Sequence, residues 1–455
     1  MMCVFNKLIR VVYPALIYLA FCHPIYAEEP LSGHLAQEDI YPGRDKDGIP
    51  DTEEITGDIF GKKSRWFHPE LSLSEEYSNN ILNTRSDKES DYITKISPTL
   101  WFCLPGRDEK ISPAVISTSI PGGEELSSLG SEFTGRMLTY VLYNFESEIY
   151  AENSGENVDS HNLDARFQLN LKSGHSLGVS NTFMRSYDTP GTGVSTELDR
   201  YRDNLAKVFL NLMISERLRI TGDYSHFYLK YDADRNAGRN RYDDTFSSYI
   251  FFHLFPKTAA LIGCELTNIN YEEETRIDSP ISDGREQRYY AGLDWQITAK
   301  SRGRLKSGTS IKTFDDSSMD KDREYLFELQ LSHQFTPRTS LVLNAYRRPS
   351  ESTINQAAYS LKYQAGSVLT HRITHKISGS LECGYTNEKF KGDLIYGPGK
   401  KERKDDYFSA APSLNYQIKR WLSTGLYYVY EERESNFSDF SYSTNTISLM
   451  MKATL

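Results

Sequence analysis

The sequence is poor in cysteine and has no excess of positive charge. Only three of its five cysteines lie beyond residue 27, at Cys103, Cys264 and Cys383, and they form no CxxC pair. An odd number without such spacing speaks against a disulfide framework and against a zinc site. The formal net charge is −10, so the chain lacks the basic character that binding to nucleic acid requires.

Long apolar runs and catalytic signatures are also missing. A transmembrane helix needs about 20 consecutive apolar residues, and no segment beyond the N-terminal region provides them. The sequence has no GxSxG, HExxH, Walker or dinucleotide-binding motif in a suitable context. We therefore expect neither a helical membrane protein nor an enzyme, and we keep an outer-membrane hydrolase as a distant alternative.

The N-terminal region has the pattern of an export signal. Lys7 and Arg10 precede an apolar stretch over residues 11–22, and Ala27 ends a small-residue cleavage site. The apolar stretch is too short to anchor the chain in a membrane. We predict a signal peptide over residues 1–27.

Beyond about Gly135 the sequence alternates between apolar and polar residues in segments of about ten to fifteen residues, as strands of a transmembrane barrel do. In residues 163–172 polar positions alternate with five apolar ones, Leu163, Ala165, Phe167, Leu169 and Leu171. The mean hydropathy is only −0.55 although the chain has 31 tyrosines and 22 phenylalanines. A wall that is apolar on one face only, with aromatic girdles at both membrane interfaces, accounts for both values.

The connections between these segments alternate in length. Tight turns are expected at residues 173–175, 215–217, 256–257, 299–301, 337–338, 374–375 and 419–420. Long polar stretches lie between them, at residues 151–159, 189–202, 233–240, 272–285, 316–321, 391–404 and 434–440. With strands near 69–77 and 90–104, this alternation predicts an all-β, antiparallel up-and-down transmembrane barrel of about eighteen strands (16 to 18) over residues 63–455. Both termini are then expected in the periplasm of a bacterium, with the barrel integral to its outer membrane.

One segment interrupts the alternation. Residues 105–133 fall on the periplasmic side by this count, yet they are many and they contain Pro105, Pro113 and the sequence Pro121-Gly122-Gly123. Three alternatives stay open for this segment: a periplasmic insertion, a plug inside the lumen, or a hairpin missed in the count.

Charged residues of both signs occupy the positions that face the predicted lumen. The basic candidates are Arg166, Lys172, Arg219, Arg304, Lys306, Lys312 and Lys362. The acidic candidates are Asp223, Glu265, Asp294, Glu328 and Glu382. Such charges either set the selectivity of a pore for groups such as uronate or phosphate, or pair with one another and hold the inner wall together.

Aromatic residues divide between the two faces. Sugar rings stack on aromatic side chains, so we regard the inward tyrosines as possible sugar contacts, namely Tyr290, Tyr346 and Tyr427. Other aromatic residues are expected in outward-facing girdles, among them Tyr289, Trp295, Phe327, Tyr359 and Phe408.

The segment GRDKDGIPDTEE, residues 43–54, resembles a calcium-binding loop. Its candidate ligands are the carboxylates of Asp45, Asp47, Asp51 and Glu54, around a glycine that permits a sharp turn. Gly43 stands at the first ligand position. The alternative is a solvated acidic leader over residues 28–62 without metal. No other cofactor is expected.

Two parts of the chain carry a family resemblance. The first contains Tyr77-Ser78-Asn79-Asn80-Ile81, then Ser90-Asp91-Tyr92-Ile93-Thr94 and Ser97-Pro98; the second contains Lys404-Asp405-Asp406-Tyr407, Tyr430, Arg433 and residues 442–445. Together they resemble the outer-membrane β-barrel proteins, of the porin 2 type, that occur with bacterial exopolysaccharide and capsule synthesis systems.

This resemblance implies a role in exopolysaccharide or capsular polysaccharide secretion. The implied partners are a polysaccharide ligand, periplasmic components of polysaccharide export, the barrel assembly machinery, and the lipid and lipopolysaccharide of the outer membrane. A general porin or small-solute channel is the alternative, and nucleic acid is not an expected partner.

Overall fold

The computed structural model describes residues 66–454, apart from 108–109, 112–113, 127–132, 134, 190–197, 273–281, 299, 318, 355–356 and 397–398. The side chains of residues 297 and 393–400 are also not described. The predicted signal peptide, the acidic leader and the candidate calcium ligands Asp45, Asp47, Asp51 and Glu54 therefore lie outside the described residues.

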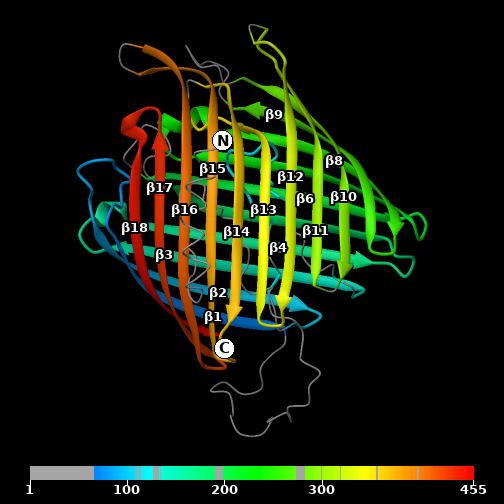
Figure 1. The fold of residues 1–455 in the computed structure, drawn as a ribbon, viewed down its shortest axis with the longest axis horizontal. Helices are drawn as coiled ribbons and strands as arrows, with labels where there is room; N and C mark the ends of the chain where they lie inside the picture. Colours follow the sequence, from blue (N-terminus) through cyan, green and yellow to red (C-terminus); the bar gives the residue numbers. More distant parts are fainter. Residues whose placement is uncertain are drawn as a thin grey trace.

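Eighteen antiparallel strands form one closed sheet (Figure 1). Each strand pairs with the next along the chain, and β18 pairs with β1, which closes the barrel. The prediction of an all-β, antiparallel up-and-down barrel of eighteen strands is confirmed. The strands are β1 (Phe67–Ser78), β2 (Asp91–Leu104), β3 (Met137–Tyr150), β4 (Val158–Asn170), β5 (Ser176–Asp188), β6 (Asp199–Met213), β7 (Leu218–Tyr231), β8 (Arg241–Phe255), β9 (Thr258–Tyr271), β10 (Gly284–Thr298), β11 (Ser301–Phe314), β12 (Asp322–Thr336), β13 (Thr339–Glu351), β14 (Tyr359–Arg372), β15 (Ile377–Tyr396), β16 (Gly399–Lys419), β17 (Leu422–Ser435) and β18 (Tyr442–Thr454).

Among the described residues, three short 3-10 helices lie in the longer connections: η1 (Ser154–Glu156), η2 (Asp234–Arg239) and η3 (Ser438–Phe440). Within the part of the chain that the structure describes, none of the helices has the length and apolar character needed to cross a membrane.

The alternation of side chains along each strand produces two different faces. On β4 the side chains of Leu163 and Phe167 are exposed on the outside, whereas Asp164 and Gln168 are buried on the inside. Successive side chains of a strand point to opposite faces, so a period of two in the sequence separates the apolar outer surface from the polar lumen.

The strands join through short turns at one end of the barrel and longer loops at the other. The stretch 391–404 is a correction to the predicted loops, because most of it continues β15 and β16. Its residues pair across a long two-stranded extension, with Asp393 opposite Glu402 and Leu394 opposite Lys401. With 20 and 21 residues, β15 and β16 are therefore longer than the other strands.

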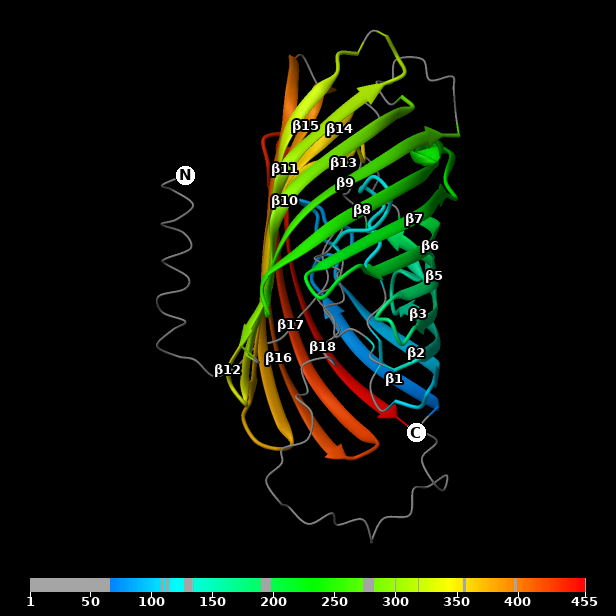
Figure 2. The same ribbon diagram turned by 90° about the vertical axis from the view of Figure 1, so that its right-hand side faces the viewer.

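The connection from β2 to β3 begins and ends at the short-turn end, yet it enters the barrel (Figure 2). Near its start, Lys110 forms an ion pair of 2.6 Å with Glu70 on β1. Near its end, the Asn170 side chain donates a hydrogen bond of 2.6 Å to the carbonyl of Phe133. Between these points the described residues contact strands β6, β7, β8, β10, β13 and β14 from inside. The described residues of this connection therefore lie inside the lumen, where the alternative of a plug places them, and we call this connection the plug.

Residues 114–126 form the inner part of this plug, and we call them the lumenal hairpin. Ile116 and Glu124 form a β-bridge, and the amide of Ser117 donates a hydrogen bond of 2.8 Å to the carbonyl of Gly123. Gly122 and Gly123 have φ angles of +82° and +76°, a region that favours glycine. The Pro-Gly-Gly sequence thus makes a tight turn at the tip of the hairpin.

An apolar patch on the inner wall receives the lumenal hairpin. Ile116 packs there against five buried side chains of β6 and β7, Tyr201, Leu205, Phe227, Leu229 and Tyr231. A Cβ atom on Gly123 would lie 2.3 Å from the Phe227 ring, so this turn fits only with a glycine in place. The hairpin therefore removes apolar wall surface from water, which stabilises its position inside the barrel.

The two segments that carry the family resemblance meet where β1 pairs with β18, which we call the barrel seam. The amide of Asn79, just after β1, donates to the carbonyl of Asn445 on β18, and the amide of Asn445 donates at 2.8 Å to the Asn79 side chain. The Asn80 side chain donates to the carbonyls of Ser443 and Thr84, at 3.1 and 2.8 Å. These residues hold the first loop against the last strand at the long-loop end.

Candidate functional site in the barrel lumen

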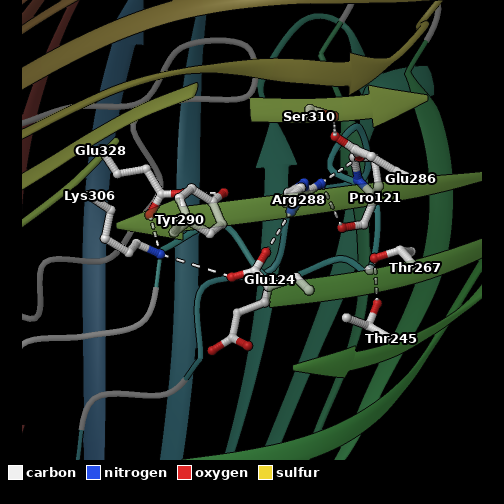
Figure 3. Close-up of polar contacts among 12 residues, drawn as sticks. Pro121, Glu124, Thr245, Thr267, Glu286, Arg288, Tyr290, Lys306, Ser310 and Glu328 are labelled. Atoms are coloured by element: carbon white, nitrogen blue, oxygen red, sulfur yellow. Dashed lines mark hydrogen bonds and ion pairs between the residues drawn. The ribbon is translucent and has the colours of Figure 1, made fainter. Parts of the chain in front are cut away.

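Arg288 on β10 is the centre of the charge network that faces the lumenal hairpin (Figure 3). Its guanidinium forms ion pairs with Glu286 on the same strand at 2.7 Å and with Glu265 on β9 at 3.2 Å. It also donates a hydrogen bond of 3.5 Å to the carbonyl of Pro121 at the hairpin tip. Arg288 thus links the wall to the plug.

Lys306 on β11 forms the second part of this network. Its ammonium lies 2.6 Å from Glu328 on β12, 3.9 Å from Glu265, and 4.5 Å from the centre of the Tyr290 ring (Figure 3). The Tyr290 hydroxyl donates to Glu328 at 2.8 Å. Both the ring face and the hydroxyl of Tyr290 are therefore engaged by wall residues while the hairpin is in place.

Arg241 and Asp243 on β8 hold the turn of the hairpin. Asp243 is completely buried, accepts a hydrogen bond of 2.8 Å from the amide of Gly122, and pairs with Arg241 at 3.2 Å. Arg241 also donates to the carbonyl of Ile120 at 3.2 Å. A buried charge that loses its partner destabilises the folded protein, so Arg241 and Asp243 each depend on the other for stability.

The opposite wall also binds the hairpin. Lys362 on β14 donates a hydrogen bond of 2.9 Å to the Ser119 hydroxyl, and the amide of Glu351 on β13 donates to the Ser119 carbonyl. On a third side, Lys207 on β6 forms an ion pair of 2.7 Å with Glu124. The hairpin therefore spans the lumen between β6 to β10 and β13 to β14.

The other basic candidates occupy varied positions. Arg304 pairs with Asp294 at 2.6 Å, and Arg219 lies over the Phe251 ring at 4.2 Å. Arg166 lies over the Phe209 ring at 5.2 Å, and Lys312 pairs with Glu351. Lys172 differs from the rest. The alternation predicts that this strand continues through Lys172, but β4 ends two residues earlier, so Lys172 lies in an exposed turn.

The remaining acidic candidates and tyrosines lie on inward positions. Asp223 is 3.7 Å from Lys207, and Glu382 is half-buried on β15. The Tyr346 hydroxyl donates to Gln364 at 2.6 Å, and the Tyr427 hydroxyl donates to Asn415 at 2.9 Å. Of the three tyrosines, Tyr290 and Tyr346 are buried, whereas the Tyr427 ring is only half-buried.

The prediction that Tyr359 belongs to an outward-facing girdle is wrong. It is buried and its hydroxyl donates to Asp322, although its parity predicts an outward position. It lies at the first residue of β14, beside a loop whose Ile354 and Ala357 are also buried. The period of two does not extend into a connection that packs against other residues, so parity fails at the strand end.

Sequence reasoning missed most residues that hold the hairpin. Arg241, Asp243, Glu286 and Arg288 all lie on inward positions of β8 and β10. A further signal was available in the sequence, since Leu205, Phe227 and Leu229 put apolar side chains on the inward parity of β6 and β7. An apolar patch inside a polar lumen indicates that something covers it.

More than half of the chain matches the model of one protein family. Residues 144–455 match the model of a protein family described as Putative beta-barrel porin 2. The chain belongs to this porin family. The match covers more than half of the chain and includes every strand from β4 to β18. Together with the closed antiparallel wall and its apolar outer surface, it makes the protein a porin-like β-barrel of the bacterial outer membrane.

Solved structures similar to this porin-family chain are remote in sequence. The outer-membrane protein OpdK of Pseudomonas aeruginosa is 9% identical, with a TM-score of 0.43 over 86% of this chain and 99% of OpdK. OccAB4 of Acinetobacter baumannii is 9% identical, with a TM-score of 0.42 over 86% and 98%. A mutant ferric enterobactin receptor, PfeA of P. aeruginosa, is 9% identical, with a TM-score of 0.42 over 87% and 81%. At TM-scores this low, the similarities carry no argument about function. No curated protein matches the sequence.

Within the described residues of the porin-family barrel, no group of three or more histidine, cysteine, aspartate or glutamate side chains is arranged to hold a metal ion. The described side chains that line this lumen include fixed charges, hydroxyl groups and aromatic faces.

Proposed function

We propose that the protein is a gated outer-membrane channel for charged, hydrophilic solutes, in which the lumenal hairpin is the gate. One observation carries this proposal: the hairpin spans a polar lumen and is held there mainly by side-chain contacts, such as Lys362 with Ser119 and Lys207 with Glu124. Water and solute can replace such contacts when the hairpin moves, whereas the hydrogen bonds of the wall stay intact. Charges of both signs on the wall would then line the opened path.

Polysaccharide secretion is the second candidate function. The segments that resemble proteins of exopolysaccharide systems favour it, although they lie at the seam and not in the lumen. An inward ring that stays half-exposed, that of Tyr427, offers a surface on which a sugar can stack. In this case the cargo is a polymer with uronate or phosphate groups, and periplasmic export components are its source.

Conductance in a planar lipid bilayer tests the gate. The wild-type protein is compared with a variant in which residues 114–126 are replaced by glycine and serine. We expect small or brief currents from the wild type and larger, steady currents from the variant, because the hairpin then no longer spans the lumen. Equal conductance of the two proteins would contradict the proposal.

A second variant keeps the chain length. Gly123→Ala places a Cβ atom 2.3 Å from the Phe227 ring and strains a residue with positive φ, so it loosens the hairpin without deleting it. Gly155→Ala is the matched control, because a Cβ atom there meets nothing within 4 Å. We expect more frequent opening for Gly123→Ala only. Channel opening that is the same in both variants would count against the gate.

The cargo is tested separately from the gate. An anionic oligosaccharide that reduces the current of the hairpin-deleted protein, while a neutral one of equal length does not, supports the polymer. Accumulation of polymer in the periplasm of a deletion strain supports secretion. Retained secretion together with lost uptake of a small solute supports a general porin.

A further inference from the structure

Four polar side chains form a compact inward group on β13 and β14, next to the hairpin tip. In the register of these strands Arg348 lies directly opposite Lys362, and Ser350 lies directly opposite Ser360. Since alternate residues of a strand share a face, all four side chains point into the lumen. The ammonium of Lys362 reaches Ser119 of the hairpin at 2.9 Å. The group is therefore a patch of neighbouring donors on one surface.

Three of these side chains, those of Arg348, Ser350 and Ser360, are buried and have polar atoms without a partner among the described residues. Arg348 is 2% exposed, and Ser350 and Ser360 are both 0% exposed. Among the described residues, no atom accepts a hydrogen bond from Nε or Nη2 of Arg348, and neither serine hydroxyl has a partner. Buried polar groups in folded proteins nearly always have a partner, so four such atoms in one patch are suited to binding a polar group.

The chemistry of the patch points to an anion. A guanidinium and an ammonium only donate hydrogen bonds, and a serine hydroxyl can donate one. Arg348 forms no ion pair with any described carboxylate; Glu388 lies 3.9 Å from Lys362, and Glu265 is already shared by Arg288 and Lys306. Arg348 thus retains a positive charge without a paired carboxylate, which one water molecule with two acceptor sites does not neutralise.

We propose that Arg348, Lys362, Ser350 and Ser360 form a binding site for an oxyanion, either a phosphate or a carboxylate group. Such a group has several acceptor oxygens and a negative charge, and arginine binds it through two parallel hydrogen bonds. Ser119 of the lumenal hairpin covers the site and shares Lys362 with the anion. The site is independent of channel gating, although it fits the proposed transport of anionic solutes.

Calorimetric titration of the full chain in detergent tests the site. Sodium phosphate, as the probe, is titrated at an ionic strength matched with sodium chloride. We expect the wild type to bind phosphate. Arg348→Gln should weaken binding by about tenfold to a hundredfold, since it removes a charged donor pair. The double variant Ser350→Ala with Ser360→Ala should weaken it by about tenfold.

Arg347→Gln is the matched control. Arg347 is the adjacent residue, faces the outside, and pairs with Glu324 at 2.7 Å, so its replacement changes the charge equally without touching the site. It should bind phosphate as the wild type does. Absence of binding by the wild type to both phosphate and the carboxylate probe described below, or equal loss in Arg347→Gln and Arg348→Gln, would overturn the site. The serine variants keep the test valid if Arg348→Gln does not fold.

A second titration identifies the source of the oxyanion. Trigalacturonate is compared with maltotriose, a neutral sugar of equal length. Binding of trigalacturonate through Arg348 assigns the site to a carboxylate on a larger solute, whereas binding of phosphate alone assigns it to a free anion; either result supports the site. Conductance is not used here, so failure of this site and failure of the proposed gate are distinguishable.

Discussion

At the scale of single residues, adjacent positions on a strand have opposite environments in this barrel. Asp243 is completely buried beside Arg241 and the hairpin, whereas Asp244 faces outward and accepts hydrogen bonds from Tyr224 and His226. Both are aspartates on the same strand. The same substitution at each position therefore separates the effect of the lumenal contacts from the effect of losing a carboxylate.

We expect Asp243→Asn to lower the free energy of unfolding by about 3 kcal/mol, because it leaves the buried charge of Arg241 without its carboxylate. Asp244→Asn should change it by less than about 1 kcal/mol, since exposed ion pairs contribute little. Urea unfolding in detergent, followed by tryptophan fluorescence, measures both. Equal losses from the two substitutions would mean that the Arg241 pair is not a determinant of stability.

The sequence predicts which residues face the lumen, but it does not predict which side chains they contact. Parity alone indicates that Lys306 and Glu328 face inward, because a period of two fixes the side of the wall. Their mutual distance of 2.6 Å depends on the register between β11 and β12, and Arg288 meets Pro121 only because the hairpin is folded inside. Register and plug position are long-range properties that no local pattern encodes.

At the scale of elements, the seam between β1 and β18 depends on one loop. Asn80 is buried, and its side chain bonds to the first loop and to β18 at once, through Thr84 and Ser443. The residues that produce the family resemblance thus have a structural role in closing the sheet.

We predict that Asn80→Ala lowers the temperature at which the folded barrel melts in detergent, because it removes the hydrogen bonds that the buried Asn80 side chain donates to the carbonyls of Thr84 and Ser443. The expected cost is about 1–3 kcal/mol. Asn270→Ala is a suitable control, since Asn270 lies away from the seam and makes a long hydrogen bond of 3.4 Å to Tyr242. The heat-dependent shift of the folded band on a gel reports the difference; a larger shift for Asn270→Ala would refute the role of Asn80.

Elements differ in how well the sequence predicts them. Strands that face lipid are evident, because apolar residues alternate over the whole membrane height. The plug was one of three alternatives, since prolines and glycines indicate turns but not the side of the wall on which a turn lies. The patch formed by Leu205, Phe227 and Leu229 distinguishes these alternatives once it is read as an inward surface.

At the scale of the whole molecule, the long loops other than the connection from β2 to β3 lie at one end, and both ends of the barrel chain, Phe67 and Thr454, lie at the other. We predict that the short-turn end faces the periplasm. An epitope inserted in the loop between β11 and β12 should be detected on intact cells, and one inserted in the turn between β12 and β13 only after permeabilisation. The reverse result would invert the orientation.

The attachment of the plug sets how it can move. Both of its ends join the wall at the same rim, where β2 stops and β3 starts, and the wall closes elsewhere, between β18 and β1. The segment thus enters and leaves the barrel at the same end and is not a strand threaded from one side to the other. If it acts as the proposed gate, it can withdraw by the way it entered without parting any two strands, so opening and closing would not require the barrel to unfold.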